Sequence, residues 1–388
     1  RRKNSWLSMK CMIFSLLSLP IVMLTAVFVF FVFTGCVHLW LCFRQFHSIT
    51  NLPTLDGSIS EQPVSIIICA HNEEHNLKNL LPKLLEQSYW EYEVIIGLDR
   101  CTDGSKKYLT SLNGPKVKFV EVTRTPTGWD HKKHILTQCV NQAKHEWLLL
   151  TDADCKPVSH NWISTFTPYM KEQQNLILGV SPYKPANNLV SLMTEYETFM
   201  TASNYLSEAA NNRPYMGVGR NLMYRKSLFQ QIDGFDEIQS ITGGDDDLLI
   251  QKIGLQIRAG INIHQESLTY SAPERTWNKY LTQKIRHLSV GKHYQKKYKH
   301  RLSLQSGIHS SLWVSFLSLV GFSDNHWRII VPFALLVLIK GLFFTKIAGK
   351  TGLPLRVAWY PIMDFMYAIF LPLVAIRAML ERNIRWKK

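Results

Sequence analysis

The chain has 388 residues, with 44 Lys and Arg against 29 Asp and Glu, and a formal net charge of +15. This length exceeds one minimal domain, and a composition with 46% hydrophobic residues excludes a largely disordered protein. The seven cysteines form no CxxC pair, which excludes a cysteine-based metal or disulfide framework and fits a reducing, cytosolic setting.

The first predicted element is a membrane helix. Residues 11–43 carry no Lys, Arg, Asp or Glu, and a bilayer span needs about 20 apolar residues. The run is too long for one straight span and too short for two, so we expect one long or tilted helix, kinked near Pro20. It is also much longer than the apolar core of a signal peptide. Residues 1–51 are therefore predicted to be an N-terminal membrane anchor.

Residues 52–305 predict a domain of alternating strands and helices. Strands are expected at residues 63–70, 92–98, 116–122 and 146–151, with helices at 73–87, 103–112 and 131–144. This alternation predicts a doubly wound α/β domain, in which ligands bind beyond the carboxyl ends of the strands. That rule singles out the polar residues after the strands: His71 to Glu73, Asp99, and Asp152 with Asp154.

Two acidic motifs stand out. Asp152 and Asp154 directly follow an apolar strand, and two carboxylates at that spacing can hold Mg²⁺ or Mn²⁺, which then bridges ligand phosphates. The alternative is an ordinary strand-to-helix turn with an Asp cap. Asp245, Asp246 and Asp247 follow two glycines, and such adjacent carboxylates repel one another, which favours a raised pKa or a cationic neighbour. One of these carboxylates could act as a general base. Alternatively, the three could simply form an acid-rich helix N-terminus, where the helix dipole favours anions.

A basic segment follows. At helical spacing Gln283 and Arg286 share a face, and Arg can clamp a phosphate with two hydrogen bonds. The later cluster of lysines up to residue 301 is typical of a helix on anionic lipid. Because this dense positive charge lies just before further apolar runs, it favours a cytoplasmic position for residues 52–305.

Residues 306–388 predict two or three transmembrane helices. The candidates are residues 307–322, residues 329–344 with Lys340 inside, and residues 357–376 with Asp364 inside, the last being the best span. The chain is therefore expected to be an integral protein of the plasma or inner membrane. A nucleic-acid partner is not expected for a chain anchored at both ends.

The middle of the chain resembles a known family. Residues 63–294 resemble family 2 glycosyltransferases with a GT-A fold, and among them the membrane-embedded relatives of cellulose, hyaluronan and poly-N-acetylglucosamine synthases. The matching segments, in order, are VSIIICAHNEE, LDRCTDGS, GWDHKKHIL, TDADC, GVGRNLMYRK, GGDDDL and QKIRH. The last resembles the family's QxxRW motif with His287 in place of Trp.

The resemblance implies a role for each matched residue. The expected nucleotide-binding residues are Ala70, Glu73, Asp99, Lys132, Asp152, Gln283 and Arg286, with Lys133 as a second lysine. The expected metal ligands, for Mg²⁺ or Mn²⁺, are Asp152 and Asp154. The expected catalytic residues are Asp246, as the base, and Asp245 beside it. The expected acceptor-binding residues are Gly219, Arg220, Asn221 and His287.

The implied reaction is inverting transfer of a hexose from a UDP-sugar. His287 in place of Trp, together with few and short C-terminal spans, favours a lipid or lipid-linked glycan acceptor over a growing polymer. A processive polysaccharide synthase is the alternative acceptor hypothesis. A non-catalytic nucleotide-sugar-binding membrane scaffold is the alternative from another class.

Overall fold

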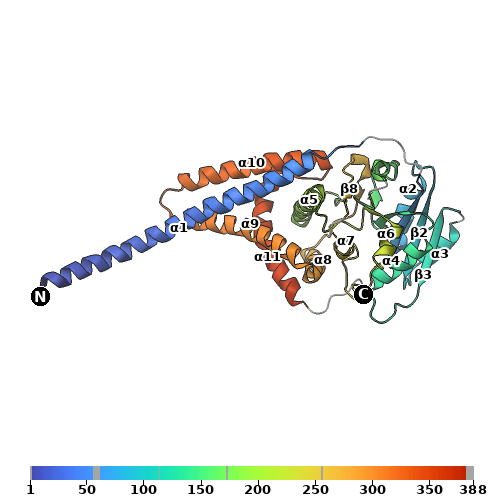
Figure 1. The fold of residues 1–388 in the computed structure, drawn as a ribbon, viewed down its shortest axis with the longest axis horizontal. Helices are drawn as coiled ribbons and strands as arrows, with labels where there is room; N and C mark the ends of the chain where they lie inside the picture. Colours follow the sequence, from blue (N-terminus) through green and yellow to red (C-terminus); the bar gives the residue numbers. More distant parts are fainter. Residues whose placement is uncertain (1, 56–61, 113, 172–173, 255–256, 382–388) are drawn as a thin grey trace.

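The computed structural model describes residues 2–55, 62–112, 114–171, 174–254 and 257–381. Figure 1 shows a bundle of long helices at one end of the molecule and an α/β domain at the other. Helix α5 (Leu189–Ala210) lies where the two parts meet, and it contacts both the bundle helix α1 and strand β8 of the domain.

The domain is built on a seven-stranded sheet in the order β3-β2-β1-β4-β7-β6-β8. Its strands are β1 (Val64–Ala70), β2 (Tyr92–Asp99), β3 (Val117–Val122), β4 (Trp147–Asp152), β6 (Leu176–Leu178), β7 (Leu222–Arg225) and β8 (Ala259–Ile261). The first four are parallel and confirm the four predicted strands, whereas β7 runs antiparallel to β4 and β6. Because β1 pairs with both β2 and β4, the loops after these three strands meet at one edge.

Helices cover both faces of the sheet, as predicted. They are α2 (Glu74–Leu85), α3 (Ser105–Ser111) and α4 (His131–Gln142). Successive residues of a strand point to opposite faces, so Ile66 and Ile68 of β1 pack with the leucines of α2, whereas Ile67 packs with Ile135 of α4. The buried strands and the two flanking layers confirm the α/β fold class.

Shorter elements complete the domain. They are β5 (Lys156–Pro157), β9 (Thr269–Tyr270), α6 (Lys226–Gln231), α7 (Asp247–Ile253), α8 (Trp277–Ser289) and the 3₁₀ turns Ser164–Tyr169, Gln265–Ser267, Val290–His293 and Val357–Trp359. Helix α7 begins at the acidic motif, and α8 carries the QKIRH segment.

The bundle consists of α1 (Arg2–Thr50), α9 (Lys296–Phe322), α10 (Trp327–Thr351) and α11 (Tyr360–Leu380). Three segments are long and apolar enough to cross a membrane, with mean hydropathies of 2.3 for Val22–Thr50, 2.0 for Trp327–Thr351 and 1.7 for Val357–Leu380. The predicted apolar run at residues 307–322 is the second half of α9, which passes without a break through residue 305.

Helix α11 lies differently from the other three. Figure 1 shows α1, α9 and α10 running side by side, while α11 is inclined steeply to them. Both ends of α11 contact the domain. Before it, the Arg356 guanidinium lies 3.1 Å from the Glu195 carboxylate, and after it Lys292 Nζ donates to the Glu381 carbonyl at 2.6 Å. The residues predicted as the best C-terminal span therefore form a helix that lies at the domain-facing end of the bundle.

Buried acidic residues of α5 connect the domain to its surroundings. Glu208 is fully buried and accepts from Arg44 of α1 and Arg301 of α9. Glu197 accepts from Tyr280 at 2.6 Å and pairs with Lys284 of α8 at 2.9 Å. Removing one partner of such a buried pair costs about 3–5 kcal/mol, so these pairs fix how the bundle sits on the domain.

A second buried polar cluster lies inside the bundle, around Asp364 of α11. Its carboxylate lies 2.6 Å from Lys340 of α10 and 3.0 Å from His309 of α9, and it also accepts from Trp313 and Tyr196. Lys340 Nζ is 2.8 Å from His38 of α1, so the cluster joins five helices at one point. We refer to these residues as the Asp364 cluster.

Candidate active site

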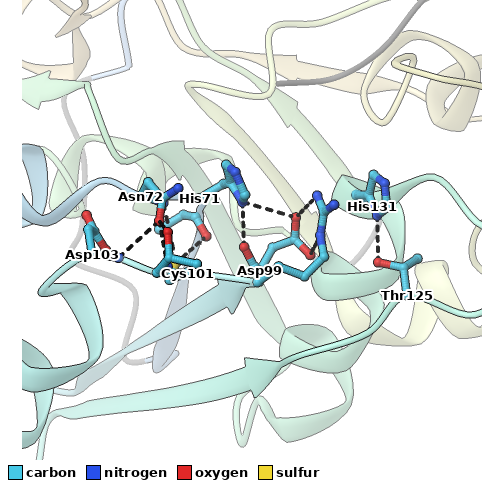
Figure 2. Close-up of polar contacts among 10 residues, drawn as sticks. His71, Asn72, Asp99, Cys101, Asp103, Thr125 and His131 are labelled. Atoms are coloured by element: carbon cyan, nitrogen blue, oxygen red, sulfur yellow. Dashed lines mark hydrogen bonds and ion pairs between the residues drawn. The ribbon is translucent and has the colours of Figure 1, made fainter. Parts of the chain in front are cut away.

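The loops after β1 and β2 are joined by hydrogen bonds at the edge of the sheet. Figure 2 shows His71 beside Asp99, and Asn72 beside Cys101 and Asp103. His71 Nδ1 lies 2.6 Å from the Asp99 carbonyl oxygen. The fully buried Asp99 carboxylate accepts two hydrogen bonds from its neighbour Arg100, at 2.7 and 3.0 Å. Asp99 is thus placed below the loops and is held by Arg100.

Asn72 lies within the predicted range 71–73, although the motifs gave it no role of its own. Its φ of 56° lies in the left-handed region, where Asn is tolerated better than most residues. Its side-chain oxygen accepts from the backbone N–H groups of Thr102 and Asp103, at 2.7 and 3.3 Å (Figure 2). The Asn72 side chain therefore aligns two loops that come from separate strands.

Lys132 joins the two acidic motifs. It lies in the first turn of α4, and its ammonium is 3.2 Å from Asp152 Oδ1 and 2.8 Å from Asp245 Oδ2. Burial opposes the charge on Lys132, but Asp152 and Asp245 outweigh it and hold the pKa of Lys132 well above its ordinary value. Burial would likewise raise the pKa of Asp245, yet Lys132 lowers it. The sequence motifs at residues 132, 152 and 245 thus meet in one charged site.

The turn that presents the three aspartates depends on two glycines. Gly243 and Gly244 have φ of 80° and 71°, which only glycine adopts readily. A Cβ on Gly244 would lie 2.7 Å from Leu248 and 2.8 Å from Val290. Lys133 is fully buried and donates to the carbonyl oxygens of Ile241 and Gly243, so this lysine supports the turn and does not reach the ligand side.

Asp246 caps helix α7 and is held at both oxygens. Its Oδ2 accepts from the Gly219 N–H and its Oδ1 from the Asp247 N–H, each at 2.8 Å. Burial and the neighbouring Asp245 raise the pKa of Asp246. Burial and Asp246 raise the pKa of Asp247 well above its usual range, and Asp247 accepts from the Tyr294 hydroxyl. A carboxylate with a raised pKa beside a binding site is suited to take up a proton.

Helix α8 supplies the opposite wall of the site. Gln283, Arg286 and His287 all line the same cavity as the aspartates. Gln283 Oε1 is buried without a hydrogen-bond partner, and the Arg286 guanidinium has no partner among the described residues. Both groups are therefore available to a ligand.

A cavity of about 2100 Å³ contains most of the predicted site residues. It is lined by Glu73, Lys132, Asp152, Asp154, Gly219, Arg220, Asp245, Asp246, Gln283, Arg286 and His287. Ala70, Asp99 and Asn221 do not line it, and all three are fully buried. The same cavity continues between α1, α5, α9 and α11 of the bundle.

Asn221 differs from its predicted place beside the acceptor. Its amide donates at 2.8 Å to the carbonyl oxygens of Val180 and Ser267, and its oxygen accepts from Trp162 at 3.0 Å. These bonds use the side chain within the core, because a buried amide without partners would be costly. The preceding Arg220 does reach the cavity, stacked 4.3 Å from the Tyr183 ring and bonded to Ser271.

The donor atoms at the end of β4 suit a hard divalent cation. Asp152 and Asp154 offer carboxylate oxygens to the cavity, and the Lys132 ammonium beside Asp152 shows that positive charge is stabilised there. Within the described part of the chain, no group of three or more His, Cys, Asp or Glu is arranged to hold a metal ion. Mg²⁺ commonly uses one or two carboxylates together with ligand phosphates, so two aspartates fit it.

Comparison with known proteins agrees with this geometry. A family model described as glycosyl transferase family 2 matches residues 65–233. Mannosyltransferase PcManGT from Pyrobaculum calidifontis, solved with GDP-Man and Mn²⁺, has a TM-score of 0.53 and 16% identity, covering 93% of this chain and 98% of its own. TarS 1–349 from S. aureus, solved with UDP-GlcNAc, has a TM-score of 0.39 and 14% identity over 82% and 81%. No curated protein sequence matched the chain.

The matched range includes the first four strands, Lys132 and the Asp152–Asp154 pair, while Asp246 and Arg286 lie beyond it. The similarity to PcManGT extends over the bundle and shows a shared fold. The chain is therefore a glycosyltransferase with a GT-A fold, and its residues 65–233 match the glycosyl transferase family 2 model.

Proposed function

We propose that this enzyme is a membrane-bound inverting glycosyltransferase that moves a hexose from a UDP-sugar to a lipid or lipid-linked glycan. One observation carries the proposal. Asp152, Lys132, Asp245 and Asp246 converge in a cavity whose lining continues between the helices of the bundle, among them the apolar α1 and α11. Such a cavity offers a nucleotide-sugar site on one side and a route for a membrane-soluble acceptor on the other.

On the donor side, Asp152 and Asp154 would hold Mg²⁺ or Mn²⁺. The metal would supply positive charge to the departing nucleoside diphosphate. Arg286, which has no partner among the described residues, would donate to the same phosphates, and the side-chain N–H groups of Gln283 would donate beside it. Glu73 and Asn72 line the cavity beside the loop after β2, where we place the uridine, with Ala70 and Asp99 behind it.

On the acceptor side, Asp246 would take the proton of the attacking hydroxyl. The two backbone N–H groups fix its orientation, and each carboxylate oxygen keeps a further lone pair for the acceptor. Gly219, Arg220 and His287 line the cavity around it and would position the sugar or the acceptor. Asp245 would hold Lys132 in place between the motifs.

We place the α/β domain in the cytoplasm. Helices α1, α9 and α10 would cross the membrane, and α11 would lie along its inner surface, because both ends of α11 contact the domain. UDP-sugars are cytosolic, and the lysines at residues 292–299 lie on the domain side of α9, as the positive-inside rule requires.

A donor screen tests the proposal. The full chain in lipid nanodiscs with Mn²⁺ would be given UDP-glucose, UDP-N-acetylglucosamine, UDP-galactose or GDP-mannose, each with and without extracted native lipids. We expect nucleotide release from a UDP-sugar that rises with the lipid extract, and a lipid product carrying a single added hexose. Release from GDP-mannose alone would refute the UDP assignment. A polymer would favour the processive synthase, and no release from any donor would favour a binding scaffold.

A further inference from the structure

The catalytic cavity extends into the helix bundle and ends there. On the bundle side its lining reaches His38 of α1 and His309 of α9, whose rings are stacked 4.6 Å apart. Both histidines belong to the Asp364 cluster, and beyond it the described helices pack through apolar side chains such as Phe31, Leu319 and Phe333. This arm of the cavity, which we call the chamber, therefore ends at these packed helices.

The chamber has one wall of hydroxyl and amide groups. Helix α5 contributes Thr198, Thr201 and Asn204, and α9 contributes Gln305 and Ser306. Asn204 and Gln305 bond to each other at 3.1 Å. The side-chain hydroxyls of Thr198, Thr201 and Ser306 have no hydrogen-bond partner among the described residues. All three residues are partly exposed within the cavity, so their hydroxyls can bond to the hydroxyl groups of an occupant.

A second wall comes from α11 and is mostly apolar, with Arg377 as its charged member. Leu371, Ala375, Ile376 and Met379 line the cavity, and the last two are 58% and 57% exposed. Ile376 and Met379 lie one turn apart on the same face of the helix. An occupant that satisfies both walls needs a hydroxylated head and a hydrocarbon chain.

We infer that this chamber is the acceptor subsite, and that it holds the hydroxylated headgroup of a lipid, a sugar or similar polyol, against α5 and α9 with its chain along α11. The inference rests on the proposed function and narrows its acceptor. The acceptor hydroxyl would face Asp246, which lines the same cavity. Because the lining ends at the Asp364 cluster, beyond which the described helices pack through apolar side chains, the chamber fits transfer to one headgroup better than passage of a polymer.

Cysteine protection tests the subsite directly. Thr201→Cys and Ser306→Cys place thiols in the chamber. Leu304→Cys is the matched control on α9, because Leu304 is 64% exposed and does not line the cavity. The full-length variants in nanodiscs would be labelled with methyl methanethiosulfonate, and each site followed by mass spectrometry. Variants must keep the wild-type thermal midpoint to be counted.

The probes are octyl glycosides of glucose, galactose and N-acetylglucosamine, compared with octyl tetraoxyethylene ether, which has the same chain and no sugar. At ten times its dissociation constant, a bound glycoside should slow labelling at positions 201 and 306 roughly tenfold by mass action and leave position 304 unchanged. Equal protection by the ether would overturn the hydroxylated head, and protection by no glycoside would overturn the subsite.

Manganese-dependent UDP release by the wild-type protein in the same nanodiscs separates the two proposals. UDP release without protection of positions 201 and 306 would refute the acceptor subsite and leave the proposed transferase activity standing. Protection of these positions without nucleotide release from any donor would refute the proposed function and leave a chamber that binds glycolipids.

Discussion

At the scale of single residues, the site separates a carboxylate for proton transfer from carboxylates for donor binding. Asp246→Asn keeps the size of the side chain but cannot take up a proton, so turnover should fall roughly 10²–10⁴-fold. Donor affinity, measured by titration with UDP, should change little. Asp152→Asn should instead weaken donor binding, because it removes a proposed metal ligand.

The Asp246 variant needs a stability control. Asn offers one acceptor oxygen, so either the Gly219 or the Asp247 N–H loses its partner, at a cost of about 1–3 kcal/mol. Turnover should therefore be measured at a temperature below the thermal midpoint of the variant. Equal loss of UDP affinity in both variants would place Asp246 in the metal site. Near-normal turnover of Asp246→Asn would move the base to Asp245 or Asp247.

The pH dependence of turnover should reflect the effect of Asp245 on the proposed base, Asp246. Burial and Asp245 raise the pKa of Asp246, so activity should fall, as pH is lowered, at a higher pH than for an ordinary aspartate. Asp245→Asn removes one negative charge, which lowers the pKa of Asp246. The acid limb of the turnover profile should move down by about one pH unit. An acid limb that stays in place or moves up would show that Asp246 is not the titrating group.

The proposed role of Asp154 as a metal ligand can be tested through the metal dependence of UDP release. Removing divalent ions with EDTA should abolish UDP release, and added Mn²⁺ should restore it. Asp154→Ala should reproduce the loss even with Mn²⁺ present, because one of two carboxylate ligands is gone. Asp236→Ala, on an exposed aspartate outside the cavity, is the matched control and should keep activity. Full activity of the wild type in excess EDTA would contradict the metal assignment.

At the scale of elements, the turn before α7 should be sensitive to a single methyl group. Gly244→Ala places a Cβ 2.7 Å from Leu248 in a left-handed conformation, which costs about 1–3 kcal/mol. We expect a lower thermal midpoint and reduced turnover, because the turn sets the positions of Asp245 and Asp246. Gly349→Ala in α10, whose Cβ would meet open space, should leave both unchanged. Wild-type stability of Gly244→Ala would show that the turn can rearrange.

The sequence predicted these elements well where local pattern decides them. The apolar patterns of β1 to β4 and the leucine spacing of α2 were sufficient, because each buries a face set by its own periodicity. The position of the site beyond the strand ends was predicted from the sequence motifs together with the rule that ligands bind at the carboxyl ends of parallel strands. The side chain of Asn221 was misplaced, because its partners Val180, Ser267 and Trp162 are distant in sequence and leave no local signal.

At the scale of the whole molecule, the proposed topology can be tested from outside the cell. In Lys297→Cys and Glu381→Cys, an impermeant maleimide should fail to label intact cells, because both positions lie on the domain side. Asp324→Cys, in the turn between α9 and α10 at the far end of the bundle, should be labelled (Figure 1). Permeabilised cells provide the control. Labelling of position 381 in intact cells would show that α11 crosses the membrane.

The relation between bundle and domain was beyond sequence reasoning. Nothing in the sequence near Glu197 or Glu208 marks them as buried, since their partners Lys284, Arg44 and Arg301 lie on other helices. The continuation of the cavity into the bundle depends on the same packing. Sequence reasoning could therefore identify a transferase with membrane helices, but it could not show that the two share one cavity.

The Asp364 cluster has a consequence for biogenesis. If α10 crosses the membrane, it must be inserted with Lys340 near its middle, which costs about 3 kcal/mol for a lone helix. The counter-charge, Asp364, is translated 24 residues later, on α11. Newly made α10 is thus poorly accommodated in lipid until α11 has been made and packs against it, so a ribosome stalled between the two helices should hold an unfinished bundle.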